Sequence, residues 1–328
     1  MDKKERIPKR VLEKISENIK KIEKETSKVV VGQSEIIKNI ILAILCDGHI
    51  LIEGIPGIAK TLIVRTIAST IGCDMKRVQF TVDLLPSDII GINSYDPGKK
   101  VFVFKEGPVF TNFLIADEIN RSPPKTQSAL LQAMQEKEVA VGLHIHTIKR
   151  PFFVMATQNP IEQSGVYNLP EAEIDRFLFK ITMGYPTHGE EVQILDTNIS
   201  IYPFEKFDIK RIITSNEILD MQKLVKEVFS SKEIKDYIIK IINLTRDKDR
   251  DYSKFITLGS SPRGSIALHI ASKAQALMNG RDYVLPEDVD AVAKLVLRHR
   301  IILNYKAEAD KINSDKIIER ILNHLNPA

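Results

Sequence analysis

The chain has 328 residues, of which 43% are apolar, and a formal net charge of +4. This length allows two domains with buried cores, and so mild a positive charge falls well short of a dedicated nucleic-acid-binding protein. No apolar run is long enough to cross a bilayer, and the lysine-rich start lacks the apolar segment of a signal peptide. Cys46 and Cys73 lack metal-binding spacing, so we expect buried free thiols in a cytoplasmic protein.

The first 28 residues predict an amphipathic helix. Ile15, Ile19 and Ile22 recur at helical spacing among many lysines, which favours a helix packed on the rest of the protein over a basic arm. We therefore divide the chain into this helix at 1–28, an α/β core at 29–186 and a helical domain at 187–328.

Residues 29–186 alternate strand patterns with helical patterns, which predicts a doubly wound α/β core with a parallel sheet. One helix is expected to end at Gly72 and another to begin at Ser122, before two prolines. Segments 93–108 and 139–148 interrupt the alternation and are predicted as β-hairpins. The strands are expected at 50–53, 78–82, 113–116, 152–156 and 179–183.

Beyond residue 186 the strand pattern disappears and apolar residues recur at helical spacing. One of these helices carries Ile266, Ile270, Ala274 and Leu277 and is expected to end at Gly280. The segments with this periodicity are 218–228, 234–241, 266–277, 286–296 and 311–322.

The strand-like run HILIE leads into GIPGIAKT at 54–61, which has the pattern of a phosphate-binding loop. Its glycines allow a tight turn, Lys60 would reach the β- and γ-phosphates of a nucleotide, and the Thr61 hydroxyl would take a Mg²⁺ position. An ordinary strand-to-helix turn with a surface lysine is the alternative. We assign nucleotide binding to Gly54, Pro56, Gly57, Ile58, Lys60, Thr61, Leu62 and Ala59, which stands where a glycine usually precedes the lysine.

A second apolar strand, in NFLIADE, ends in an acidic pair. Because alternate side chains of a strand point opposite ways, the pair divides the labour: Asp117 would hold Mg²⁺ and Glu118 would accept a proton from the attacking water. An acidic strand end facing solvent, or a helix N-cap, is the alternative. Two such motifs in this order favour an ATP site.

Three further polar residues are candidates for the same site. Asn159 follows a strand and either orients the attacking water or forms a simple Asn-Pro turn. Arg263 follows Ser261 and Pro262 at a helix start, where a cation calls for a negative partner, either the γ-phosphate or a carboxylate. Arg176 either pairs locally with Asp175 or Glu173, or acts as an arginine finger on a neighbouring subunit.

The chain resembles the MoxR ATPases of the AAA+ superfamily between about residues 29 and 300. The segments that carry the resemblance are VVGQ, GIPGIAKT, QFTVDLLPSDIIG, LIADEINRSPPKTQSALLQAMQE, ATQNPIEQSGVYNLPEAEIDRF and GSSPRG. The resemblance implies a ring-forming, usually hexameric ATPase with its site between subunits and a helical lid domain. It also implies that the two hairpins are the helix-2 insert and the pre-sensor hairpin of this clade.

The resemblance further implies the role of each site residue. Gln33 would lie by the adenine, Asn159 would be the first sensor, Arg263 the second sensor and Arg176 the finger in trans. Asn120 and Arg121 match the family without an assigned role.

The family is associated with chaperone-like work on metal-cofactor insertion or complex assembly, commonly with partners that carry a von Willebrand factor type A domain. The resemblance therefore implies ATP-driven remodelling of a protein client. The alternatives are a nucleic-acid motor, a magnesium-chelatase-like ATPase subunit and a module that uses ATP only to hold a shape. The motor has thin support, namely Lys99, Lys100 and Lys105 in the first hairpin.

Overall fold

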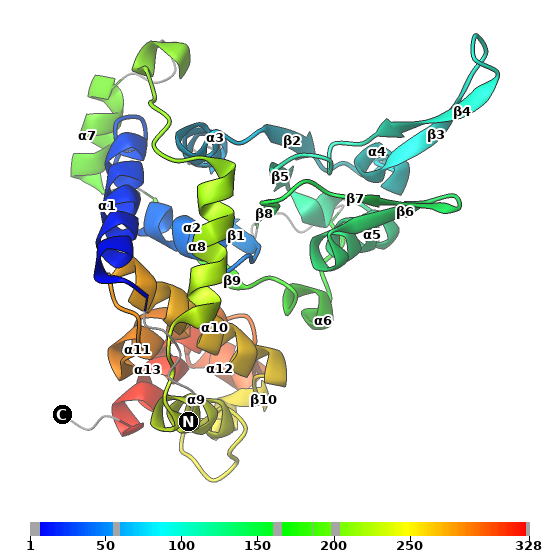
Figure 1. The fold of residues 1–328 in the computed structure, drawn as a ribbon. Helices are drawn as coiled ribbons and strands as arrows, with labels where there is room; N and C mark the ends of the chain where they lie inside the picture. The colour runs from blue at the N-terminus through cyan, green and yellow to red at the C-terminus, as the bar shows by residue number, and fades with distance from the viewer. Residues whose placement is uncertain (1–6, 55–59, 160–165, 186, 198–203, 326–328) are drawn as a thin grey trace. The chain divides into compact units, whose positions relative to one another are not determined.

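The computed structural model describes residues 7–54, 60–159, 166–185, 187–197 and 204–325 (Figure 1). Its described residues form two compact units. The first, which we call the sheet unit, lies within 20–177 and 181–219, and the second, the helical unit, lies within 1–19, 178–180 and 220–328. The domain limits at 28 and 186 suggested by the sequence stay a prediction.

A five-stranded sheet has the order β2-β5-β8-β1-β9, and the pairs β1–β8, β2–β5 and β5–β8 are parallel. The predicted α/β class is therefore confirmed. The strands are β1 (Ile50–Gly54), β2 (Met75–Gln79), β5 (Phe113–Asp117), β8 (Phe153–Gln158) and β9 (Phe179–Met183).

The second strand was predicted at 78–82, which is three residues too late in the chain at each end. β2 is an edge strand, and an edge strand tolerates exposed charged residues such as Lys76 and Arg77. These two charged residues interrupt the apolar pattern by which the start of the strand would be recognised in the sequence. Val82, which the pattern included, is 60% exposed.

Of the two helix limits predicted in the sheet unit, the end at Gly72 is confirmed and the start at Ser122 is wrong. Gly72 has a φ of +66° at the end of α3. Ser122 does not cap α5, because Pro123 is the N-cap and the Ser122 hydroxyl donates to the Ile119 carbonyl at 3.2 Å. The helices are α2 (Ser34–Leu45), α3 (Lys60–Ile71), α4 (Pro86–Ile90), α5 (Pro124–Glu136), α6 (Glu171–Ile174) and α7 (His188–Thr197). Short 3-10 turns occur at Ile119–Arg121 and Phe204–Phe207.

Both predicted hairpins are confirmed, as β3 (Gly91–Asp96) with β4 (Val101–Glu106) and β6 (Glu138–Val141) with β7 (His144–Thr147). They extend side by side from the sheet unit (Figure 1). The His146 ring stacks on the Phe104 ring with centroids 3.8 Å apart and an interplanar angle of 18°, which joins the two hairpins near their bases.

The helical unit contains the predicted helices, together with the short helix α12 (Tyr305–Ala309) and a strand pair that the sequence did not predict. Strands β10 (Ile256–Leu258) and β11 (Ile302–Leu303) form an antiparallel pair, too short to leave a periodic pattern. In α10, Ile266 is 69% exposed although its spacing placed it on the apolar face; Leu268 and Ala271 are buried instead. The helices are α9 (Lys232–Leu244), α10 (Pro262–Met278), α11 (Pro286–Leu297), α12 (Tyr305–Ala309) and α13 (Ser314–Leu325). A 3-10 turn lies at Ser253–Phe255.

Two helices, α1 (Lys9–Thr26) and α8 (Ser215–Glu227), contribute residues to both units. In α1, the predicted apolar face is present, since Ile15, Ile19 and Ile22 are at most 4% exposed.

Both cysteines, Cys46 and Cys73, are free thiols, but they are only partly buried, whereas the sequence led us to expect buried ones. Among the helices of the described residues, none has the length and apolar character of a membrane span.

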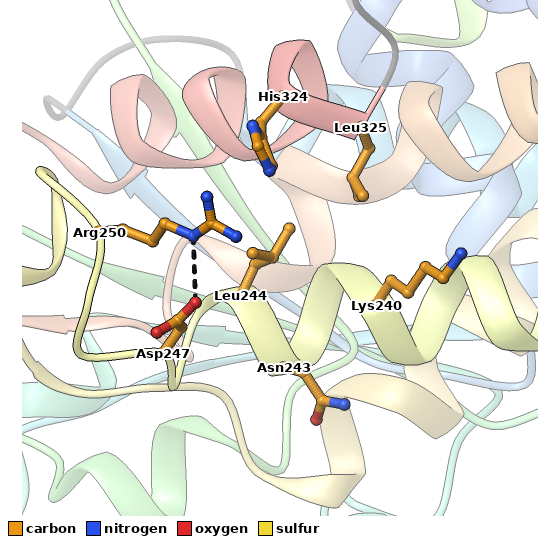
Figure 2. Close-up of a pocket in the computed structure, with 7 residues that line it drawn as sticks. All are labelled: Lys240, Asn243, Leu244, Asp247, Arg250, His324 and Leu325. Carbon is orange, nitrogen blue, oxygen red and sulfur yellow. Dashed lines mark hydrogen bonds and ion pairs between the residues drawn. The ribbon is translucent and has the colours of Figure 1, made fainter.

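An open pocket of about 350 Å³ lies in the helical unit at the ends of α9 and α13 (Figure 2). Lys240 of α9 lines it together with His324, which lies in the last turn of α13, and Arg250 pairs with Asp247 at 3.1 Å. Basic side chains at helix C-termini complement the partial negative charge of the last carbonyl groups. The end of α13 is therefore a position that suits His324.

A buried histidine ties the start of β1 to its neighbours in the sheet unit. The His49 Nδ1 accepts from the Val154 N–H at 3.1 Å, and its Nε2 lies 2.9 Å from the Met134 carbonyl oxygen. The ring is therefore neutral, with the proton on Nε2. Burial lowers the pKa of His49 from 6.5 to about 4.

This shift predicts a pH dependence of stability. Between about pH 6.5 and pH 4 the unfolded chain binds a proton at His49 that the folded chain does not, so the free energy of unfolding falls as the pH falls. In His49→Gln, whose amide offers the same donor and acceptor without titrating, the fall should be shallower by up to about 1.4 kcal/mol per pH unit. Urea unfolding at several pH values measures it. Equal slopes in both proteins would contradict the assignment.

Candidate active site

The motifs predicted from the sequence meet at one edge of the sheet. Gly54, Asp117 and Gln158 end strands β1, β5 and β8, and the carboxyl ends of parallel strands lie at the same edge. Gly54 has no room for a side chain, because a Cβ atom there would lie 2.8 Å from the Met183 carbonyl oxygen of β9. The glycine that starts the loop is thus required by the sheet itself.

Lys60 begins α3 and faces this edge. Its Nζ donates to the Gly54 carbonyl at 2.7 Å. Burial lowers the pKa of Lys60, and the negative charges of Asp117 and Glu118 act against that shift. The lysine is therefore within electrostatic range of the acidic pair. The predicted loop residues Pro56, Gly57, Ile58 and Ala59 lie outside the described residues, whereas Thr61 and Leu62 are half-buried in the first turn of α3.

Asp117 is held by a donor on each carboxylate oxygen. Its Oδ1 accepts from the Thr157 hydroxyl at 2.6 Å, and its Oδ2 accepts from Arg77 Nη2 at 2.6 Å and Nε at 3.2 Å. The side chain is 19% exposed. The carboxylate is therefore oriented by two neighbouring strands while part of it stays accessible.

Glu118 does not continue the strand, contrary to the expectation that strand alternation separates the two acids. Its backbone is left-handed, with φ 57° and ψ 50°, and its N–H donates to the Thr157 hydroxyl at 2.8 Å. Its Oε2 accepts from Gln79 Nε2 at 2.7 Å and lies 2.9 Å from Arg121 Nε in an ion pair. The turn thus directs the two carboxylates differently.

Thr157 is a functional candidate that the sequence reasoning missed. Its hydroxyl donates to Asp117 and accepts from the N–H of Glu118, and the side chain is only 1% exposed. Gln79 and Arg77 were missed too, and Arg121 now has a partner in Glu118. The segments that contain Gln79 and Thr157 carried the family resemblance, which was the available signal.

The remaining predicted residues are placed as follows. Asn159 is 9% exposed and directly follows β8, at the same sheet edge as Asp117. Gln33 is the half-buried N-cap residue of α2, and its side chain makes no capping hydrogen bond.

The two arginines lie in different units. Arg176 follows α6, and within the described part of the chain its Nε has no hydrogen-bond partner. The Glu173 carboxylate, one of its suggested local partners, accepts instead from Ser128 at 3.1 Å. Arg263 lies in the first turn of α10 in the helical unit, where its N–H donates to the Ser261 hydroxyl at 3.2 Å. The predicted helix start is thus confirmed, with Ser261 as the N-cap.

Two family models match parts of this chain. The family model "ATPase family associated with various cellular activities (AAA)" matches residues 49–179, and the model "AAA lid domain" matches residues 251–321. The chain is 43% identical to Chaperone MoxR1 of Mycobacterium tuberculosis, over 91% of this chain and 79% of the relative. It is 44% identical to the uncharacterized protein YeaC of Bacillus subtilis, over 90% of each.

A solved crystal structure shares the fold. It is of a protein from Cytophaga hutchinsonii that is assigned as an ATPase, with a TM-score of 0.88, 44% sequence identity, and coverage of 96% of this chain and 97% of the other. The sheet topology, the lysine beside the acidic pair and the helical lid define an AAA+ ATPase. Within that class, the chain belongs to the MoxR family.

The Thr157 hydroxyl provides a test of this geometry. Thr157→Val keeps the branched shape but leaves the Glu118 N–H and one Asp117 oxygen without their partner, so we expect the rate of ATP hydrolysis to fall at least tenfold. The free energy of unfolding should fall by about 1–3 kcal/mol. Thr157→Ser, which keeps the hydroxyl, is the control. ATPase assays and chemical unfolding measure both effects, and a valine variant as active as the serine variant would refute the role.

Proposed function

We propose that this chain hydrolyses ATP with Mg²⁺ at the sheet edge around Lys60, Asp117 and Glu118, and that it uses this reaction to remodel a protein client. The observation that carries the proposal is the held acidic pair: Asp117 is fixed by Thr157 and Arg77, and Glu118 by Gln79 and Arg121. Such fixed carboxylates beside a lysine suit phosphoryl chemistry, in which catalysis rests on positioning and charge.

The donor set fits Mg²⁺. The Asp117 carboxylate and the Thr61 hydroxyl are hard oxygen ligands, which Mg²⁺ prefers, and the Asp117 oxygens are oriented in advance. When bound, the ion would offset negative charge on the phosphates. Lys60 and the loop from Gly54 would bind the phosphates themselves.

In this proposal Glu118 is the general base that takes the proton from the attacking water. Its carboxylate is fixed by contacts with Gln79 and Arg121, next to Asp117 in the chain. Asn159, which directly follows β8, would orient the water. Gln33 would contact the adenine, and Arg263 would act as the second sensor from the lid.

We further propose a hexameric ring in which Arg176 reaches the site of the neighbouring subunit. Arginine fingers stabilise the charge that develops on the transferred phosphoryl group. A guanidinium nitrogen without a hydrogen-bond partner in the described part of its own chain supports this assignment over a local ion pair.

The proposed client is a protein, engaged in the cytoplasm with a partner that carries a von Willebrand factor type A domain. The hairpins support a protein over a nucleic acid, because large apolar side chains are exposed on them: Phe102 is 72% exposed, Ile145 69% and Leu143 99%. Exposed apolar surface favours contact with protein, whereas a nucleic-acid motor relies on cations along a phosphate backbone. The name of the similar Chaperone MoxR1 agrees with this role.

The base assignment is tested with Glu118→Gln. The amide keeps the shape but cannot take a proton, so ATP binding should persist while hydrolysis falls about 100-fold or more. Steady-state hydrolysis and equilibrium nucleotide binding separate the two effects. Equal, slow hydrolysis by both proteins would mean that the chain only uses ATP to hold a shape.

The same variant serves as a trap for the client. In a pull-down from native lysate, capture of a type A domain protein only with ATP is expected, and mass spectrometry identifies it. Capture of nuclease-sensitive material in its place would support the nucleic-acid motor.

The finger is tested by mixing subunits. Arg176→Ala should bind ATP without turning it over, and mixing it with Glu118→Gln subunits should restore part of the activity, because some interfaces then combine an intact Glu118 with an intact Arg176. Each variant alone is the control. If mixed rings stay inactive, Arg176 acts within its own subunit.

A further inference from the structure

Arg77 lies on the edge strand β2, two residues before Gln79. Gln79 pairs in register with Asp117 of β5, and Arg77 pairs with Ile115. Side chains two residues apart on a strand lie on the same face, so Arg77 and Gln79 are both directed toward the acidic pair, Asp117 and Glu118. The Arg77 side chain is 50% exposed.

The guanidinium makes contact with two residues of the site. Its Nη2 and Nε donate to Asp117 Oδ2 at 2.6 and 3.2 Å, and its Nη2 also donates to Gln79 Oε1 at 3.3 Å. A guanidinium presents several donors in a fixed plane, so one side chain serves both partners.

The second contact fixes the orientation of the Gln79 amide. A guanidinium only donates, so the amide oxygen faces Arg77; a carboxylate only accepts, so the amide nitrogen faces Glu118 at 2.7 Å. Arg77 therefore holds the amide from its oxygen end in the same orientation that the hydrogen bond to Glu118 favours from its nitrogen end.

We infer that Arg77 is a positioning residue for hydrolysis: it orients Asp117 directly and Glu118 through Gln79. The inference rests on the proposed ATPase function and deepens it. Arg77 is expected to touch neither the nucleotide nor the attacking water, because its Nε and Nη2 donors are directed at Asp117 and Gln79.

The contribution is one of orientation more than of fold stability. An ion pair with a half-exposed arginine adds little to stability, because water screens it. The Arg77 side chain also lies on the exposed face of β2, whereas Val78 on the other face is buried, so loss of Arg77 removes no core packing. Loss of the side chain should therefore affect turnover while the fold and nucleotide binding persist.

The test compares Arg77→Ala, Gln79→Ala and the double variant, with Arg77→Lys as the conservative change. We expect Arg77→Ala to lower kcat about tenfold or more with a change in KM for ATP below about twofold. The double variant should be about as slow as the slower single variant, because one residue acts through the other. Arg77→Lys should recover only part of kcat, because a single ammonium group cannot make all the hydrogen bonds that the planar guanidinium makes to Asp117 and Gln79.

Arg65→Ala is the matched control. Arg65 lies on α3, its side chain is 45% exposed, and it forms a 3.0 Å ion pair with Glu205 outside the site. Its loss should leave kcat unchanged. Binding of a fluorescent ATP analogue, measured without turnover, should be the same for Arg77→Ala as for the original protein.

The outcomes separate the two claims. If the original protein hydrolyses ATP and Arg77→Ala is equally fast, the inference fails and the proposed function stands. Rate losses that multiply in the double variant would overturn the claim that Arg77 orients Glu118 through Gln79, because the two residues would then act independently. If the original protein does not hydrolyse ATP, the proposed function fails and takes the inference with it.

Discussion

Two adjacent carboxylates, Asp117 and Glu118, carry like charges, and the candidate site depends on how the fold holds them. One hydroxyl does much of this work: Thr157 donates to Asp117 and accepts from the N–H of Glu118. The left-handed turn at Glu118 then separates the two side chains, and an arginine lies against each of them. The two arginines, the left-handed turn at Glu118 and the Thr157 hydroxyl together give the two carboxylates different surroundings, as a metal ligand and a general base require.

The connections of the sheet link this site to the exposed hairpins. The β3–β4 hairpin lies between β2 and β5 in the chain, and the β6–β7 hairpin lies between α5 and β8. Each hairpin therefore follows or precedes a strand that carries Gln79, Asp117 or Thr157. The chain therefore connects the carboxyl ends of these strands to the hairpins, whose exposed apolar side chains we propose contact a client. A movement of the site residues would be passed on to the hairpins along this connection.

Local patterns predicted the elements and the site residues that are near each other in sequence. Lys60 was found because its loop motif follows an apolar strand, and the acidic pair was found because it stands at the end of one. Contacts across strands could not be found this way, since they depend on register. The second strand was predicted to start at Val78, so Arg77 fell outside it and its place beside Asp117 was hidden. The β10–β11 pair was missed because strands of two or three residues have no period.

The account is tested most directly by a crystal structure of Glu118→Gln with ATP and Mg²⁺. It predicts the triphosphate at the start of α3 with Lys60 against its β- and γ-phosphates, and the metal beside Thr61 and Asp117. Arg77 should still contact Gln79. A triphosphate bound away from Lys60, or a metal held without Asp117, would contradict the account.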